Sequence, residues 1–98
     1  MLHFEWDPAK NESNKRKHRV SFEEAQTTFS DQQGLLMGDP DHAEEEDRFL
    51  LLGLSSLLRI LVVSHCYREK DEDRAIRIIS ARKANREEQA QYAQRWKP

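Results

Sequence analysis

Two apolar runs in the middle of the chain constrain its fold more than any other feature. Residues 49–54 and 57–63 gather large aliphatic side chains, in a chain of 98 residues of which 35% are charged and 37% hydrophobic. Such a composition is typical of disorder when the apolar residues are spread evenly. Because they are concentrated instead, the sequence predicts one small folded domain over residues 1–98, with a modest core and a very polar surface.

The apolar runs predict two long antiparallel strands, at residues 48–54 and 59–67, with a hairpin connection at residues 54–58. Apolar residues fall on both faces of the first of these strands, so we expect it to be central and covered on both sides. In the second strand, His65 shares a face with apolar neighbours, where a histidine is more often structural than catalytic.

A third β-branched run, at residues 74–81, is predicted to pair with the strand at 59–67 through a polar turn at 69–73. Residues 82–88 follow with no turn signal and are rich in Ala, Arg and Glu, which favours a helix that begins directly after the strand and runs over 83–96. We expect Tyr92 to dock this helix on the sheet, whereas Trp96 is equally compatible with docking and with an exposed contact.

Two helices are predicted near the N-terminus. Asp7 and Pro8 are a typical helix start, but residues 8–18 have almost no apolar face, so this helix is expected to be peripheral. Ser21 and Glu24 have capping-box spacing for a second helix that packs on the sheet. With short strands at 4–6 and 35–37, the fold class is α+β: an antiparallel sheet, two N-terminal helices and one C-terminal helix.

Charge is segregated along the chain, although the net charge is only −2. Acidic residues dominate 39–47 and 69–73, and basic residues dominate 10–19 and 74–97. Segregated charge can present a basic face to an anionic partner. The alternative is that these runs are ordinary solvated faces. The acidic run lacks the ligand spacing and turn glycine of a calcium loop, which favours a solvated loop.

Several function classes find no support in the sequence. A single cysteine, Cys66, excludes an internal disulfide and fits a reducing cytoplasm. No apolar stretch is long enough for a membrane span, and the start does not resemble a signal peptide. The four histidines are scattered and no phosphate-binding glycine loop is present, so we expect no metal or other cofactor. The expected location is the cytoplasm.

Short motifs occur in a set order along nearly the whole chain. They are Phe4-Glu5-Trp6-Asp7-Pro8, Asn14, Lys17-His18, Val20-Ser21-Phe22-Glu23-Glu24-Ala25, Asp39-Pro40, Glu46-Asp47-Arg48, Gly53, Leu61-Val62-Val63, His65, Arg68, Arg77-Ile78-Ile79-Ser80-Ala81-Arg82-Lys83-Ala84, Glu88 and Tyr92. This ordered set resembles the BrnT toxins, which belong to the RelE-like ribonucleases of bacterial toxin–antitoxin pairs. The departures are Asn85 where Thr is usual, and Glu87, Gln89 and Gln91 at positions that are often Arg.

The resemblance implies a toxin that cleaves RNA and inhibits translation. It also implies a BrnA-like antitoxin with a ribbon-helix-helix fold, and contact with promoter DNA only through the antitoxin complex. Metal-free RNA cleavage needs a base for the ribose 2′-hydroxyl, cations for the developing charge on phosphorus, and an acid for the leaving 5′-oxygen. We expect His65 to handle a proton and Arg77 and Arg82 to hold the phosphate. The assisting phosphate contacts are Arg48, Arg68, Lys83 and Arg86.

Part of this prediction depends on Arg82 and Lys83 lying at a helix N-terminus, where an anion is favoured. The competing interpretation is that Arg82 pairs with Glu87, Glu88 or the acidic loop. Two other functions also remain open: a non-catalytic RNA-binding or regulatory module, and a structural partner whose basic face only binds an acidic antitoxin.

Overall fold

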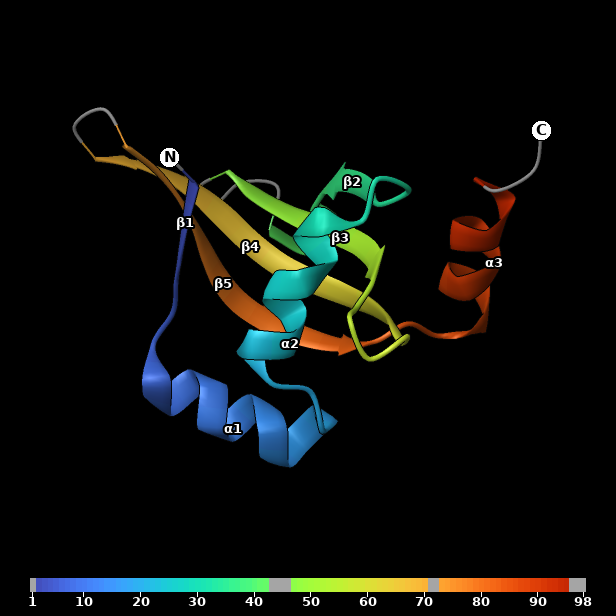
Figure 1. The fold of residues 1–98 in the computed structure, drawn as a ribbon, viewed down its shortest axis with the longest axis horizontal. Helices are drawn as coiled ribbons and strands as arrows, with labels where there is room; N and C mark the ends of the chain where they lie inside the picture. The colour runs from blue at the N-terminus through green and yellow to red at the C-terminus, as the bar shows by residue number, and fades with distance from the viewer. Residues whose placement is uncertain (1, 43–46, 71–72, 96–98) are drawn as a thin grey trace.

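The computed structural model describes residues 2–42, 47–70 and 73–95, and in it a five-stranded sheet runs in the order β1-β5-β4-β3-β2 (Figure 1). The strands are β1 (Leu2–Glu5), β2 (Leu35–Gly38), β3 (Arg48–Leu54), β4 (Ile60–Lys70) and β5 (Asp73–Lys83). The helices are α1 (Pro8–His18), α2 (Phe22–Thr27) and α3 (Arg86–Gln94), with 3-10 turns η1 (Thr28–Ser30) and η2 (Pro40–His42). The predicted α+β class is confirmed.

The sheet is mixed rather than wholly antiparallel. Strands β2 to β5 form the predicted antiparallel meander. The first strand differs from the prediction, because β1 pairs parallel with the N-terminal part of β5. No hairpin ties β1 to its neighbour. The chain leaves β1 into two helices and returns to the sheet at the opposite edge, so the direction of β1 is set by a long-range pairing.

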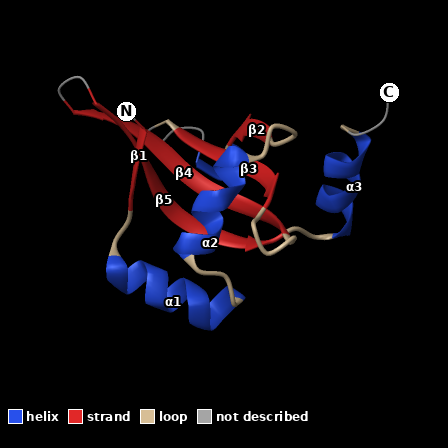
Figure 2. Cartoon of the chain, in the orientation of Figure 1, coloured by secondary structure: helices blue, strands red, loops and turns tan. Residues whose placement is uncertain are grey.

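The two faces of the sheet are covered unequally. One face packs on α2 through the main core, with α1 beside β5, and we call it the helix face (Figure 2). The other face, which we call the open face, holds a smaller core where α3 docks. The main core consists of Val20, Phe22, Ala25, Leu51, Leu61, Val63, Ile76, Ile78 and Ala81, and the smaller one of Leu52, Val62, Ala84 and Tyr92. The prediction that β3 is covered on both faces is therefore only partly confirmed.

Helix α1 is held by polar side chains in place of an apolar face. The side chain of Asn14 is buried and bonds both backbone groups of Ala81: its amide donates to the carbonyl at 2.8 Å, and its oxygen accepts from the N–H at 3.1 Å. A further bond of 2.8 Å runs from its amide to the carbonyl of Val20. Because β1 pairs only with residues 74–77 of β5, Asn14 takes the place of a neighbouring strand at the remaining edge.

The C-terminal helix begins later than predicted. Strand β5 continues to Lys83, and α3 starts at Arg86 behind Asn85, whose side chain accepts from the N–H of Glu88 at 2.8 Å. Asn85 and Glu88 form a capping box, which sets the helix start. Docking by Tyr92 is confirmed: it is buried, and its hydroxyl donates to Asp31 at 2.6 Å. Trp96 and residues 43–46 of the acidic run lie outside the described residues.

No helix within the described part of the chain is long and apolar enough to cross a membrane.

Candidate functional site

Arginines from three strands gather on the open face of the sheet. Strand alternation places Arg48 of β3 on the same side as Leu52, and Arg68 of β4 on the same side as Val62. Strand β5 adds Arg77 and Arg82, which pair in register with Cys66 and Val62 of β4. The register therefore brings these arginines to one face of the sheet.

A β-bulge makes this arrangement possible. Arg77 and Arg82 are an odd number of residues apart, so a regular strand would point them to opposite faces. The register shifts between Ser64 and His65, where Ser64 pairs with Ser80 and His65 with Ile78, which leaves Ile79 as the extra residue of β5. A bulge of this kind re-aims the side chains that follow it. Both Arg77 and Arg82 therefore reach the open face.

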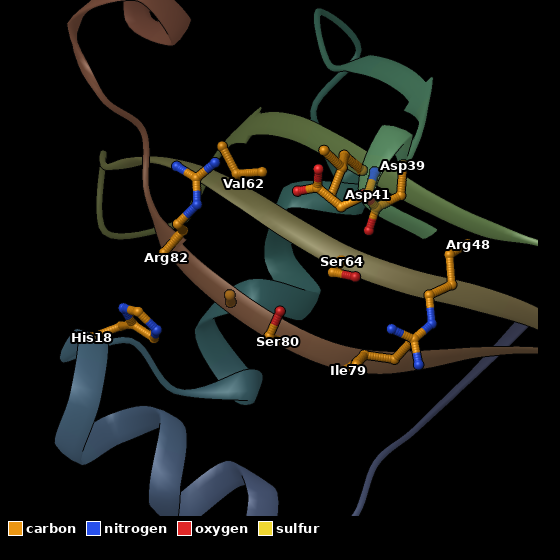
Figure 3. Close-up of a pocket in the computed structure, with 11 residues that line it drawn as sticks. His18, Asp39, Asp41, Arg48, Val62, Ser64, Ile79, Ser80 and Arg82 are labelled. Carbon is orange, nitrogen blue, oxygen red and sulfur yellow. The ribbon is translucent and has the colours of Figure 1, made fainter. Parts of the chain in front are cut away.

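A cleft of about 240 Å³ lies between these strands, the end of α1 and the segment after β2. In Figure 3, Arg82 and His18 lie at one end, Arg48 at the other, and the hydroxyls of Ser64 and Ser80 between them. Arg48 and Ile79 also line a neighbouring hollow that contains Lys10, Cys66, Arg68 and Arg77. The residues that line the cleft are His18, Asp39, Asp41, Arg48, Leu50, Val62, Ser64, Ile79, Ser80, Ala81 and Arg82.

Arg82 is held in place by a bidentate ion pair with Glu88, as the competing interpretation predicted. The guanidinium nitrogens donate to the two carboxylate oxygens at 2.7 and 2.8 Å. The hydrogen bond from Arg82 lowers the pKa of Glu88 below its usual value. The bidentate pair fixes the direction of the Arg82 side chain. Because this side chain is still 43% exposed, it stays accessible from the cleft.

Lys83 and Arg86 lie apart from the cleft. Arg82 and Lys83 end a strand, so the predicted position of both at a helix N-terminus is wrong: the capping residue is Asn85. Lys83 is exposed, and its charge acts on Glu24 of α2, on the helix-covered side. Arg86 is exposed in the first turn of α3. Both are placed to extend a basic surface and not to line the cleft.

His65 lies on the helix face, so the expectation that it acts beside Arg77 and Arg82 places it on the wrong side of the sheet. The side chain is fully buried, with its ring 4.8 Å from that of Phe29. Its Nδ1 donates to the Val63 carbonyl at 3.0 Å, and its Nε2 lies 3.4 Å from the Tyr67 hydroxyl. Burial lowers the pKa of His65. The sheet separates this imidazole from the cleft, and this environment is typical of a structural histidine.

Sequence reasoning missed His18, Asp39, Ser64 and Ser80 as cleft residues. His18 belongs to the basic run at residues 10–19, for which the sequence leaves open both a solvated face and a contact with an anionic partner. The signal that points to it is helical spacing, since Asn14 and His18 are one turn apart on α1 and therefore share a face. Asp39 is buried and accepts from the N–H of Asp41 at 3.0 Å, which turns the chain after β2.

Comparison with known proteins identifies a family and a similar solved structure. The family model described as "Ribonuclease toxin, BrnT, of type II toxin-antitoxin system" matches residues 6–88. The 1.1 Å crystal structure of the Brucella abortus ribonuclease toxin BrnT is similar, with a TM-score of 0.61 and 22% sequence identity over 88% of this chain and 99% of that one. At 22% identity this similarity supports the fold alone. No curated protein matches the sequence.

Proposed function

Because the chain belongs to the BrnT family of ribonuclease toxins of type II toxin–antitoxin systems, whose activity is RNA cleavage, we propose that the cleft on the open face binds and cuts RNA. One observation carries this proposal. A bulge in β5 brings Arg77 and Arg82 to the face that already carries Arg48, around the hydroxyls of Ser64 and Ser80. Such a concentration of guanidinium groups suits a phosphate.

The arginines supply the electrostatic part of the reaction. When the ribose 2′-oxygen attacks phosphorus, negative charge grows on the non-bridging oxygens, and preorganised cations stabilise that charge. Arg82 is preorganised by Glu88, and Arg77 and Arg48 approach from the neighbouring hollow. Arg68, which lies 3.5 Å from Glu5, and the exposed Lys83 and Arg86 extend the path of the RNA strand beyond the scissile phosphate.

Cleavage is proposed to need no metal ion. The 2′-hydroxyl is the nucleophile, so no metal-bound water is required, and cations on the protein neutralise the phosphate charge. Within residues 2–42, 47–70 and 73–95, the side chains of His, Cys, Asp and Glu form no group of three suited to a metal. Cleavage that persists unchanged in a chelator is expected, and its loss there would contradict this part of the proposal.

The toxin family implies an antitoxin, and we take its identity to be a BrnA-like ribbon-helix-helix protein. Such a partner neutralises the toxin in the cytoplasm and carries the promoter-DNA contact of the pair. The basic open face is the surface it is expected to cover, because a partner with acidic side chains would both match its charge and block RNA. Co-purification with the product of the neighbouring gene tests this, and a toxin recovered alone from its host would contradict it.

The decisive experiment compares two arginines of β5. Arg77→Ala removes a side chain on the open face, while Arg74→Ala removes an exposed one on the other side of the same strand, 3.6 Å from Glu69. Purified variants are incubated with single-stranded RNA, and cleavage is followed at saturating protein. We expect Arg77→Ala to lower the rate by roughly 10²–10³-fold and Arg74→Ala to have little effect.

Equal rates for both variants would place the chemistry outside the cleft. A wild-type protein that binds RNA without cutting it would instead support the alternative, a non-catalytic RNA-binding module.

A further inference from the structure

His18 reaches the cleft from a helix that is fixed against the strand of the arginines. Asn14, one turn earlier on α1, is buried and bonded to both backbone groups of Ala81, next to Arg82. Since residues four apart lie one above the other on a helix, His18 shares the face of Asn14, and Figure 3 shows its side chain directed toward β5. It is exposed and lines the cleft together with Ser80 and Arg82.

The backbone around His18 is held from several sides. Arg19 closes α1 in the left-handed region, with φ of 57°, and its N–H donates to the carbonyl of Lys15 at 3.0 Å. Its own carbonyl accepts from Arg59 at 3.0 Å. A non-glycine residue in this region stores backbone strain, which structures retain where the surroundings hold the conformation. An exposed imidazole on a fixed backbone is suited to a defined contact with a ligand.

RNA cleavage in the cleft also needs a proton donor. The leaving 5′-oxygen is a poor leaving group unless it is protonated. Among the described residues that line the cleft, the arginines do not give up a proton, serine hydroxyls are very weak acids, and an ionised carboxylate such as Asp39 or Asp41 is a hydrogen-bond acceptor only. Imidazole is the side chain that both holds and releases a proton near neutrality. Of the lining residues that the structure describes, His18 is the one that carries an imidazole.

We propose that His18 is the general acid of RNA cleavage, an inference that rests on the proposed function. The 2′-hydroxyl loses its proton to a base and its oxygen bonds to phosphorus. The bond from phosphorus to the 5′-oxygen breaks, and the imidazolium of His18 gives its proton to that oxygen. The products are a 2′,3′-cyclic phosphate and a 5′-hydroxyl end. The base gains one proton and His18 loses one, and proton exchange with water restores both groups, so no other co-reactant is needed.

The test uses the whole protein and a substrate that needs no acid. One RNA oligonucleotide carries a normal linkage at the site that the wild-type protein cuts, and a second carries sulfur in place of the bridging 5′-oxygen there. A thiolate leaves without a proton, because thiols are far stronger acids than alcohols. The variant is His18→Gln. Its matched control is His3→Gln, since His3 is exposed on β1, with its Nε2 3.9 Å from Asp73.

We expect His18→Gln to cut the normal RNA about 10²–10⁴-fold more slowly than wild type and the sulfur-containing RNA at close to the wild-type rate. Affinity for an RNA with a 2′-deoxy sugar at the cut site should change little, and His3→Gln should match wild type throughout. Arg77→Ala should slow both substrates, because a phosphate contact acts whatever the leaving group is.

Two results would overturn the assignment while leaving the proposed function intact: His18→Gln that cuts both substrates at the wild-type rate, or that is equally slow on both. If the wild-type protein fails to cut the normal RNA at all, the proposed function itself is wrong.

Discussion

Replacing Asn14 with alanine is expected to destabilise the fold more than any surface change to α1. The side chain makes three hydrogen bonds, to both backbone groups of Ala81 and to the carbonyl of Val20. It is only 6% exposed, so water cannot easily replace it. Each bond contributes about 1 kcal/mol, and a buried group left unsatisfied costs about 1–3 kcal/mol. We therefore expect Asn14→Ala to lower the free energy of unfolding by roughly 3–5 kcal/mol.

A domain of this size has about 5–15 kcal/mol of stability in total, so the loss is large enough to measure by urea unfolding followed by circular dichroism. The matched control is Asn85→Ala, which makes the same chemical change at an exposed helix cap. Loss of a cap costs about 1 kcal/mol. If Asn14→Ala costs no more than Asn85→Ala, Asn14 does not replace a strand at the β5 edge, and α1 must be held in another way.

Three further predictions concern single side chains. Burial lowers the pKa of His65. On acidification the unfolded chain therefore binds a proton before the folded one does, and the free energy of unfolding should fall as the pH drops below about 6.5. His65→Gln should remove this pH dependence from urea midpoints, whereas loss of cleavage in a fully folded His65→Gln would support the predicted proton-transfer role. Tyr92→Phe should lower the free energy of unfolding by about 1–2 kcal/mol, because the hydroxyl loses its hydrogen bond to Asp31; thermal unfolding measures this. Tyr67→Phe removes a weaker contact, in which the hydroxyl lies 3.4 Å from an imidazole nitrogen, and an equal loss of stability in that variant would refute the prediction. Glu88→Gln should lower RNA cleavage several-fold by releasing Arg82, while unchanged single-turnover rates would show that preorganisation by this pair is unimportant.

Local patterns predicted most of the fold. The strands at β3, β4 and β5 follow from alternating or β-branched runs, and hairpins join strands that are consecutive in the chain. The parallel pairing of β1 could not be predicted in the same way, because its partner is about seventy residues away in sequence and no local turn links them. The start of α3 was predictable in principle, since Asn85 and Glu88 have capping-box spacing.

The site was predicted in part. The arginines were identified from charge clustering, but their relation to His65 was not. His65 and Arg68 are an odd number of residues apart on one strand, which by itself puts them on opposite faces. Arg77 and Arg82 are also an odd number apart, yet they share a face because of the bulge. Periodicity alone cannot distinguish these two cases, because a bulge depends on the pairing of both strands.

The bulge at Ile79 also has a consequence for how this chain can vary in length. Ile79 is the extra residue of the bulge, so deleting it would leave Ser80, Ala81 and Arg82 opposite the same residues of β4. Arg77 and Arg82 would then be an even number of residues apart in a regular strand and would still share the open face. Deleting Ser80 as well would place Ala81 opposite Ser64 and Arg82 opposite Val63, in the main core. Deletion libraries should therefore tolerate the loss of one residue between these two arginines and reject the loss of two.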